Sequence, residues 1–467
     1  MGYGRTTRHA RAFRSSPNSP PVAQTPEMRT ARGAALRALV ALEKGKTGRL
    51  DSVLDRRGMA DRDRALALEV ARGVERRRIF LDAVLDAFVK KPPRDPRVRT
   101  ALRLGAYQLL ELSRIPAYAA VAETVGLLQA GRGRGFANAV LRRIAGQVAD
   151  RAADPGLPRR EVALGDARAF VLERDWLPDP GRDPAGYHAV LHGLPRWIVA
   201  RWQEHFGAAT AERLAAASAR TPAVFLRANQ RLGSAAELRD MLAAEGIETE
   251  PTDHPLLLRW SGGATPFGGA AYQAGWFSVQ DPTALRAVEA IGARAGEVIA
   301  DLCAGPGTKA SVLAEQVGSS GRVHGYDVSE ARRKPIRANA KRLRLEGILE
   351  VHDDLEAIPV ADRVLVDVPC SNTGVLARRV EVRRRLHEGS FAELAATQRQ
   401  LLDKALRMVR RGGVVGYSTC SIEPEENDGI LEAVLHDQHQ VLRRELTLPD
   451  PPRHDGGFIA VVRVGAE

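Results

Sequence analysis

The stretch of sequence that decides the fold runs from residue 298 to residue 310 and reads VIADLCAGPGTKA. It begins with a largely apolar run of strand length, Val298–Leu302, and continues into small residues that allow a tight turn and a close approach to a ligand. Similar apolar runs recur at 323–326, 349–351, 364–368 and 414–417, with helical stretches between them. This alternation predicts an α/β domain with a parallel sheet covered by helices on both faces, over residues 276–467.

The turn after the first strand should lie at the carboxyl edge of the sheet, where such folds bind ligands. A nucleotide-hydrolysing loop requires GxxxxGK followed by Ser or Thr, whereas here Thr308 precedes Lys309 and Ala310 follows it. The order of residues therefore disfavours nucleotide hydrolysis. The third glycine of a dinucleotide-binding GxGxxG motif is also missing, although spacing alone does not exclude that fold.

Two further acidic positions follow strands of the same sheet. Asp327 ends the second strand and could accept the ribose hydroxyls of NAD or of S-adenosylmethionine, or it could cap a helix. Asp353 and Asp354 follow the third strand, where a carboxylate could receive an adenine amino group. Either could equally be an ordinary acidic residue of a loop.

The chain has three cysteines, and each directly follows a predicted strand: Cys303, Cys370 and Cys420. They are too few for a disulfide framework and too far apart in sequence for a CxxC zinc motif, so we expect no metal. Free thiols are typical of a reducing cytosol, which predicts a cytoplasmic protein. A lone cysteine is usually a small buried apolar residue, but three at one ligand-binding edge favour nucleophilic catalysis.

Two thiols and an acid beside a cofactor pocket suit methylation of carbon 5 of cytosine. That carbon is a poor nucleophile until a thiolate adds to carbon 6 and turns the ring into an enamine. A carboxyl group near ring nitrogen 3, a role that suits Asp367, would neutralise the charge that develops. A base must then remove the proton from carbon 5, and a second thiol could assist that elimination.

Three segments carry a specific likeness: DLCAGPGTKA at 301–310, DVPCSNTG at 367–374 and YSTCSIEPEEN at 417–427. They resemble the RNA 5-methylcytosine methyltransferases of the Sun/Fmu type, which implies a Rossmann-like domain that uses S-adenosylmethionine. The resemblance implies Cys420 as the nucleophile, Cys370 as an aid to product release and Asp367 as the catalytic acid. It also implies a set of cofactor-binding residues, which are Cys303, Ala304, Gly305, Pro306, Gly307, Thr308, Lys309, Asp327, Asp354 (preferred over Asp353) and Asp367.

Residues 28–148 show helical periodicity throughout, which predicts a bundle of five to seven helices. The segments VAETV at 121–125 and FANAVLR at 136–142 resemble the antitermination factor NusB, whose fold implies an RNA-binding module. We interpret 1–27 as a disordered basic tail, 149–190 as a linker and 191–275 as a small α+β domain. A NusB-like bundle, a small domain and a Sun-type domain together resemble bacterial methyltransferases of small-subunit ribosomal RNA.

The net charge is +12, and subtracting 8 Lys from 69 basic residues leaves 61 Arg. A polyanion is therefore the first partner to consider, although an Arg bias from genomic base composition is an equal alternative. The candidates for phosphate contacts are Arg378, Arg379, Arg383, Arg384 and Arg385. A solvated Arg-rich helix face is the competing interpretation. The sequence contains no apolar stretch of about 18 residues, which is the length that would indicate a membrane span.

The sequence therefore predicts a monomeric enzyme that methylates carbon 5 of a cytosine in RNA, with 16S ribosomal RNA as the expected target. Transfer RNA or large-subunit ribosomal RNA are alternative targets. A methyltransferase acting on an exocyclic amine is disfavoured because Cys370 stands where an aromatic residue would be expected. A non-catalytic ribosome-assembly factor that binds RNA is a further alternative. The family's Pro-Asp-x-Lys-Trp segment is replaced here by Val380–Arg384, which leaves the target base open.

Overall fold

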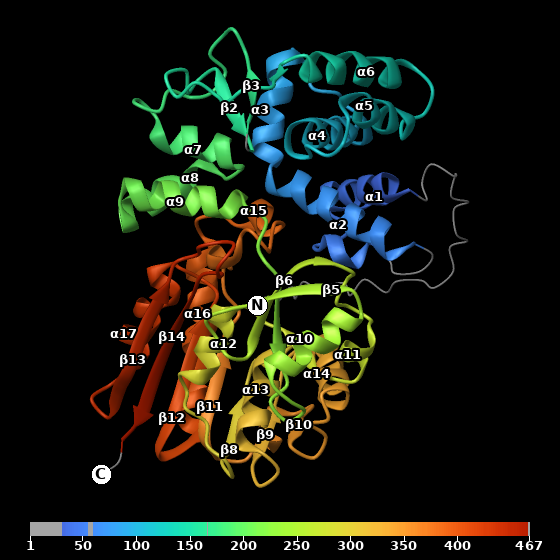
Figure 1. The fold of residues 1–467 in the computed structure, drawn as a ribbon. Helices are drawn as coiled ribbons and strands as arrows, with labels where there is room; N and C mark the ends of the chain where they lie inside the picture. The colour runs from blue at the N-terminus through green and yellow to red at the C-terminus, as the bar shows by residue number, and fades with distance from the viewer. Residues whose placement is uncertain (1–29, 55–58, 166, 466–467) are drawn as a thin grey trace, which may run out of the picture.

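The computed structural model describes residues 30–54, 59–165 and 167–465. The predicted basic tail at 1–27 lies outside the described residues. Figure 1 shows a helical domain above a twisted sheet domain, with the small domain that contains β5, β6 and α10 beside the sheet. In the described part of the chain no helix is both long and apolar enough to cross a bilayer.

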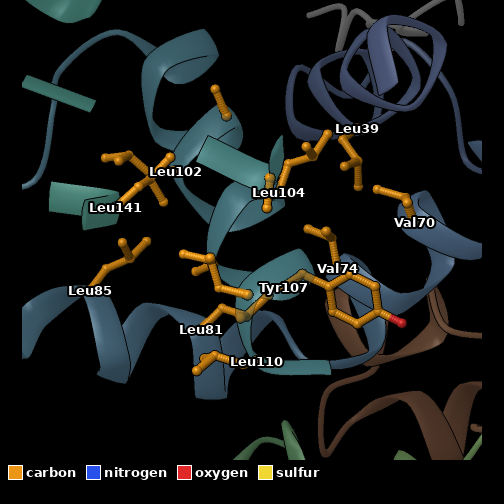
Figure 2. Packing of buried hydrophobic residues seen from close by; sticks show 14 of the residues in the cluster. Leu39, Val70, Val74, Leu81, Leu85, Leu102, Leu104, Tyr107, Leu110 and Leu141 are labelled. Carbon is orange, nitrogen blue, oxygen red and sulfur yellow. The ribbon is translucent and has the colours of Figure 1, made fainter. Parts of the chain in front are cut away.

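Six α-helices build the N-terminal domain within the described residues, which confirms the predicted bundle. They are α1 (Ala31–Glu43), α2 (Asp61–Arg76), α3 (Arg78–Phe88), α4 (Pro96–Glu111), α5 (Ala117–Gly126) and α6 (Arg132–Ala145), with a short 3-10 turn η2 (Leu50–Ser52) after α1. Helix α4 is central: its Leu102, Leu104, Tyr107 and Leu110 face the leucines and valines of α1, α2, α3 and α6 (Figure 2). Burying each large side chain contributes about 1.5–3 kcal/mol to stability, so this one helix organises the domain.

The prediction of a linker at 149–190 is wrong. A small antiparallel sheet of order β1-β3-β2 is formed by β1 (Val148–Ala149), β2 (Glu161–Leu164) and β3 (Arg168–Val171), and helix α7 (Pro184–His192) follows. Val162 and Phe170 are buried in the core of the N-terminal domain. These strands are too short to show a period of two in the sequence, and the polar loops between them dominate the composition.

The small domain contains an antiparallel sheet of order β5-β6-β4-β7. Its elements are α8 (Arg196–Phe206), α9 (Ala208–Ala219), β4 (Phe225–Ala228), α10 (Ala235–Ala244), β5 (Ile247–Pro251), β6 (Leu257–Gly263), α11 (Ala270–Gln273) and β7 (Phe277–Val279). Strand β7 pairs with β4, so the small domain extends past the boundary predicted at 275. The predicted boundary falls too early because a three-residue strand has no pattern of its own.

The C-terminal domain is built on a seven-stranded sheet of order β10-β9-β8-β11-β12-β14-β13. Five strands are parallel, as predicted: β8 (Val298–Asp301), β9 (Arg322–Gly325), β10 (Leu349–Val351), β11 (Ala361–Asp367) and β12 (Val409–Thr419). The sequence did not predict the antiparallel strands β13 (His439–Thr447) and β14 (Gly457–Val464). Most of β13 is exposed, so it lacks the apolar run by which the parallel strands are recognised.

Helices cover both faces of this sheet, as the alternating pattern predicted. One face packs against α12 (Pro282–Glu289), α13 (Thr308–Val317) and α14 (Glu330–Arg342), and the other against α16 (Ser390–Met408) and α17 (Asp428–Val434). Short elements follow the strands: η3 (Leu355–Ala357), η4 (Thr373–Val375), α15 (Val382–Arg385) and η5 (Pro424–Glu426). The carboxyl ends of β8, β9, β10, β11 and β12 therefore share one edge, and the candidate site residues lie there.

Candidate active site

Two of the three cysteines meet at the carboxyl edge of the sheet. Cys370 follows β11 and Cys420 follows β12, and these strands are parallel neighbours in which Asp367 lies opposite Ser418. The two loops therefore leave the sheet side by side. The Sγ atoms of Cys370 and Cys420 lie 3.1 Å apart, although 50 positions separate the residues in the chain. The sequence placed all three cysteines at this edge, and the structure brings Cys370 and Cys420 into contact.

A buried glutamate holds the two cysteine loops together. The carboxylate of Glu426 accepts hydrogen bonds from the backbone N–H of Ser371 (2.8 Å), from the hydroxyl of Ser421 (2.5 Å) and from the hydroxyl of Ser371. Gln398 of α16 donates a further bond (2.9 Å). Each serine directly follows one of the paired cysteines, so Glu426 fixes the position of both thiols. The PEEN motif that contains Glu426 was recognised in the sequence, but its glutamate had no predicted role.

The two thiols of the pair differ in their environment. The pKa of Cys370 is raised well above its usual range by the hydrogen bond to the sulfur of Cys420, by burial and by the negative charge that Cys420 can carry. Cys370 therefore holds its proton firmly, while the sulfur of Cys420 lies 3.3 Å from Oδ1 of Asn372. Cys303 does not join the pair: it follows β8, and burial together with the charge of Asp301 raises its pKa.

An acid and an ammonium group lie beside the sulfur pair. Lys309 donates a hydrogen bond from Nζ to Oδ2 of Asp367 (2.7 Å), and the hydroxyl of Ser418 donates to Oδ1 (3.0 Å). The pKa of Lys309 is raised: burial, the largest single influence, lowers it, but Asp367 and Cys420 together outweigh burial. Lys309 was predicted among the cofactor ligands, and the structure places its ammonium group against the carboxylate of Asp367.

A cavity of about 60 Å³ that opens to solvent adjoins this group of residues. Its inner wall is formed by Lys309, Asp367 and Cys420, and α12 with its N-cap contributes Arg286 and Asp281 to its lining. A substrate base in this cavity would meet the sulfur of Cys420 and the acid on the same side.

The loop at 303–309 is shaped by close approach to the end of the second strand. A Cβ atom added at Gly305 would lie 2.6 Å from Oδ2 of Asp327 and 2.6 Å from Cβ of Arg332, so only glycine fits. The N–H of Gly305 donates to Asp327 (3.3 Å), and Gly307 has a φ of 102°, a backbone conformation that favours glycine. The loop and Asp327 therefore form one small cradle.

Asp301 belongs to this cradle, although the sequence motifs predicted no role for it. Its side chain is 0% exposed, and Oδ2 has no hydrogen-bond partner. Burial, helped by the charge of Asp367, raises the pKa of Asp301 to about 7. A buried carboxylate oxygen without a partner is costly unless a ligand satisfies it. S-adenosylmethionine carries an ammonium and a sulfonium group, so this donor set fits that cofactor.

The two acidic residues after the third strand, Asp353 and Asp354, differ in their hydrogen-bond partners. Asp353 accepts hydrogen bonds from Arg333 (3.0 Å) and Arg337 (2.7 Å). Asp354 caps η3 by accepting from the N–H of Glu356 (3.1 Å). The carboxylate of Asp354 is thus free of ion pairs in the described part of the chain, which keeps it as the preferred candidate for the cofactor.

The structure corrects the prediction for Arg383. Its side chain is 5% exposed, and its guanidinium group donates to the carbonyl oxygens of Gly193 (3.3 Å), Arg76 and Ser218. A group enclosed in this way cannot contact a phosphate. The sequence showed a run of arginines but not that the loop containing them is inserted between domains.

Two other predicted arginines are also used inside the protein. Arg384 pairs with Glu75 (2.6 Å) and Glu43 (2.8 Å) of the N-terminal domain, and Arg378 pairs with Asp455 (2.7 Å). Their charges are neutralised by carboxylates. Of the predicted set, the exposed members are Arg379 and Arg385.

Comparison with known proteins identifies all three domains. The family model described as 16S rRNA methyltransferase RsmB/F matches residues 288–464, the NusB family model matches 29–146, and the ferredoxin-like domain of RsmF/B-like methyltransferases matches 194–257. In fold, the chain is similar to the crystal structure of PH0851 (TM-score 0.72, 20% identity, 95% of this chain and 99% of that one). It is also similar to that of a methyltransferase homologue from Pyrococcus horikoshii (TM-score 0.54, 23% identity, 62% of this chain and 100% of that one).

Relatives of similar length have sequence identities of 30–35% to this chain. The probable ribosomal RNA small subunit methyltransferase B of Bacillus subtilis is 31% identical over 89% of this chain and 90% of its own length. A putative methyltransferase of Mycobacterium tuberculosis is 35% identical over 89% and 88%. Ribosomal RNA small subunit methyltransferase B of Yersinia pestis is 30% identical over 90% and 95%. These matches confirm the resemblance that the motifs indicated, and the chain belongs to the RsmB/F family of 16S rRNA methyltransferases.

Proposed function

We propose that the protein methylates carbon 5 of a cytosine in small-subunit ribosomal RNA, using S-adenosylmethionine and a covalent bond from Cys420 to carbon 6. The observation that carries this proposal is the pair of sulfur atoms 3.1 Å apart beside the Lys309–Asp367 pair. Methylation of an exocyclic amine requires no thiol. Two thiols with an adjacent proton donor are what addition to, and elimination from, a pyrimidine ring require.

In the addition step, Cys420 attacks carbon 6 as its thiolate, and negative charge develops on the ring. The Lys309–Asp367 pair supplies a hydrogen bond and a proton to ring nitrogen 3, which stabilises that charge. The Ser418 hydroxyl keeps the Asp367 carboxylate oriented while this happens. Carbon 5 then has enamine character and can form a bond to an electrophilic carbon.

In the release step, the changed charge on Cys420 matters. Two of the causes that raise the pKa of Cys370 come from Cys420: the hydrogen bond between the two sulfurs and the negative charge that Cys420 can carry. Both weaken once Cys420 has become a thioether, so Cys370 can then ionise. The proton of Cys370 passes to solvent, and the resulting thiolate takes the proton from carbon 5. The bond between carbon 6 and Cys420 breaks with the electron pair left on Cys420, and ring nitrogen 3 returns its proton to the Lys309–Asp367 pair. The sulfur pair thereby returns to its starting state with one proton on Cys370.

The cofactor would be held by the loop at 303–309, by the carboxylates of Asp301 and Asp327 and by Asp354, with Asp367 at its reactive end. When bound, S-adenosylmethionine supplies an electrophilic methyl group. Asp301 would accept a hydrogen bond from its ammonium group, since Oδ2 has no partner within the described chain. Asp327 would accept from the ribose hydroxyls, an arrangement common at the end of a second strand.

Several observations support RNA of the small ribosomal subunit as the substrate. The relatives of similar length are named for that activity, the N-terminal domain matches the NusB family, and the net charge of +12 suits a polyanion. A target cytosine must be unstacked to reach the cavity beside Cys420, and arginine contacts to phosphates would offset that cost. Two thiols this close together also need a reducing compartment, which supports action in the cytoplasm.

The direct test is to incubate the protein with isotopically labelled S-adenosylmethionine and transcripts of 16S ribosomal RNA, 23S ribosomal RNA and transfer RNA. Mass spectrometry of the digested RNA should show 5-methylcytosine in the 16S transcript alone. Bisulfite sequencing of ribosomal RNA from a deletion strain then locates the base. A label on any atom other than carbon 5 of cytosine would reject the chemistry, and methylation confined to another RNA would reject the target.

A further inference from the structure

Helix α15 lies at the junction between the N-terminal domain and the sheet domain (Figure 1). Exposed arginines of both domains come from loops that contact each other there. Arg379 precedes α15 and Arg385 is its last residue; both are exposed, as is Arg49 in the loop after α1. Two contacts hold these loops together: the N–H of Leu50 donates to Glu381 (3.1 Å), and Glu43 pairs with Arg384 (2.8 Å). The exposed arginines are therefore fixed near one another, because each contact involves residues close to them in the chain.

A fourth arginine extends this group to the cofactor loop. The side chain of Arg332 is 58% exposed and lies 3.7 Å from Oδ2 of Asp327, the acid of the cradle beside Gly305. Arg332 also acts electrostatically on Arg49. We call Arg49, Arg379, Arg385 and Arg332 the basic strip. It extends from the N-terminal domain, across the loop that follows Cys370, to the cradle of the active site.

In the basic strip, Arg332 pairs with Asp327 (3.7 Å), whereas the charges of the other three arginines are not compensated by ion pairs within the described residues. Burial lowers the pKa of Arg49, and its neighbours Arg379, Arg332 and Arg385 lower it further, with Glu381 as the opposing charge. In the described part of the chain, no ion pair joins Arg49, Arg379 or Arg385 to a carboxylate. Like charges held together cost free energy unless a partner neutralises them. Arg384, in the same junction, is by contrast paired with Glu75.

We propose that the basic strip is the track for the phosphodiester backbone of the RNA strand that delivers the target cytosine to Cys420. This inference rests on the proposed function. The planar guanidinium forks of four arginines suit successive phosphates, which they can bind through two hydrogen bonds each. Because ion pairs and hydrogen bonds fix the N-terminal domain against the loop at 376–386, one RNA strand can contact both domains at once. The N-terminal domain then helps to set the register of the target base.

The test measures how RNA affinity depends on salt. Binding of a 16S ribosomal RNA fragment is titrated at a series of salt concentrations for the wild type, for Arg49→Gln, for Arg332→Gln and for the double variant Arg379→Gln/Arg385→Gln. For a single strand, each phosphate that an arginine neutralises adds about 0.7 to the slope of log K against log salt. We expect the slope to flatten by about 0.7 in each single variant and by about 1.4 in the double variant.

The matched control is Arg407→Gln, because Arg407 is 67% exposed at the far end of α16, away from the strip. Its slope should equal that of the wild type. If the slopes of the strip variants stay at the wild-type value, the basic strip is not the track for the RNA. The same conclusion follows if an acidic polypeptide of matched charge competes for the protein as well as RNA does. Failure of the proposed function looks different: the wild type would bind RNA with its full slope but form no 5-methylcytosine.

Discussion

Lys309 and Asp367 form an ion pair of 2.7 Å between segments that follow neighbouring strands of the sheet. Lys309 lies at the end of the loop after β8, where the cofactor is expected, and reaches across to the acid at the end of β11. The pair therefore links the cofactor loop to the sulfur pair. A substitution in the cofactor loop is therefore expected to affect the acid beside the sulfur pair, and a substitution of that acid is expected to affect the cofactor loop.

Replacing Lys309 by methionine removes the ammonium group and keeps the approximate length of the side chain. Without the donor, charge on the ring during addition is poorly stabilised, and we expect kcat to fall by about 10²–10⁴-fold. Single-turnover methyl transfer at saturating cofactor measures this. Lys404→Met is the control, because Lys404 pairs with Glu356 on the surface and should leave kcat unchanged. Equal effects of both substitutions would contradict the role given to Lys309.

Cys420→Ala should abolish methyl transfer and leave S-adenosylmethionine binding intact, because the cradle at 303–309 does not involve Cys420. Calorimetry measures the binding and a labelled-methyl assay the turnover. The surface variant Lys404→Met serves again as the comparison and should retain turnover. Residual activity in Cys420→Ala would show that another group is the nucleophile.

Cys370→Ala should accumulate a covalent protein–RNA adduct, because the base that completes elimination is missing. A denaturing gel with labelled RNA would show a shifted band that is absent from the double variant Cys370→Ala/Cys420→Ala. If Cys370→Ala releases methylated RNA at the wild-type rate, Cys370 has no part in release.

The affinity for S-adenosylmethionine should depend on pH near neutrality. The pKa of Asp301 is about 7 in the free protein, and a cationic ligand favours the ionised carboxylate. Below pH 7 the proton must leave before the carboxylate can meet the ammonium group, so affinity should rise with pH through this pKa. Calorimetry on the acidic side of the pKa, in buffers of different ionisation enthalpy, should detect the released proton. Asp301→Asn should weaken binding and remove the pH dependence; a wild-type affinity that is flat across this range would contradict the assignment.

Glu75→Ala should destabilise the protein by about 1.5–3 kcal/mol, because Arg384 loses its charge-assisted hydrogen bonds to a buried carboxylate and keeps Glu43 as its remaining partner. The side chain of Glu75 is 0% exposed and lies 2.6 Å from Arg384. Thermal and denaturant unfolding measure the loss. Glu330→Ala breaks an exposed pair with Lys334 and should cost at most about 1 kcal/mol. Similar losses for both variants would show that the buried contact adds nothing.

Much of the fold and the identity of the reacting groups could be predicted from local patterns. The five parallel strands are apolar runs between helices, and Cys370, Cys420 and Asp367 follow such runs or end them, so their meeting at one edge follows from topology alone. The strands β1, β2 and β3 could not be predicted in this way, because short strands with polar loops leave no periodicity.

Residues whose role depends on a distant partner were missed or misassigned. Glu426 acts by accepting bonds from Ser371, 55 positions away, and Asp301 matters because one of its buried oxygens has no partner. Nothing local marks either property. The arginines at 378–385 form one cationic run in sequence, whereas in three dimensions Arg383 is enclosed, Arg384 is paired and Arg379 is exposed. Burial and pairing across domains separate residues that are equivalent in sequence.

The short distance between the two sulfur atoms makes this site chemically addressable. Trivalent arsenicals bind strongly only where two thiols can reach one arsenic atom, and the sulfur atoms of Cys370 and Cys420 lie 3.1 Å apart. Such a reagent would bridge the pair, leave the solitary Cys303 unbridged and block the site to substrate. The short distance that lets one thiol attack and the other release the product therefore also makes this pair of thiols a selective target for such inhibitors.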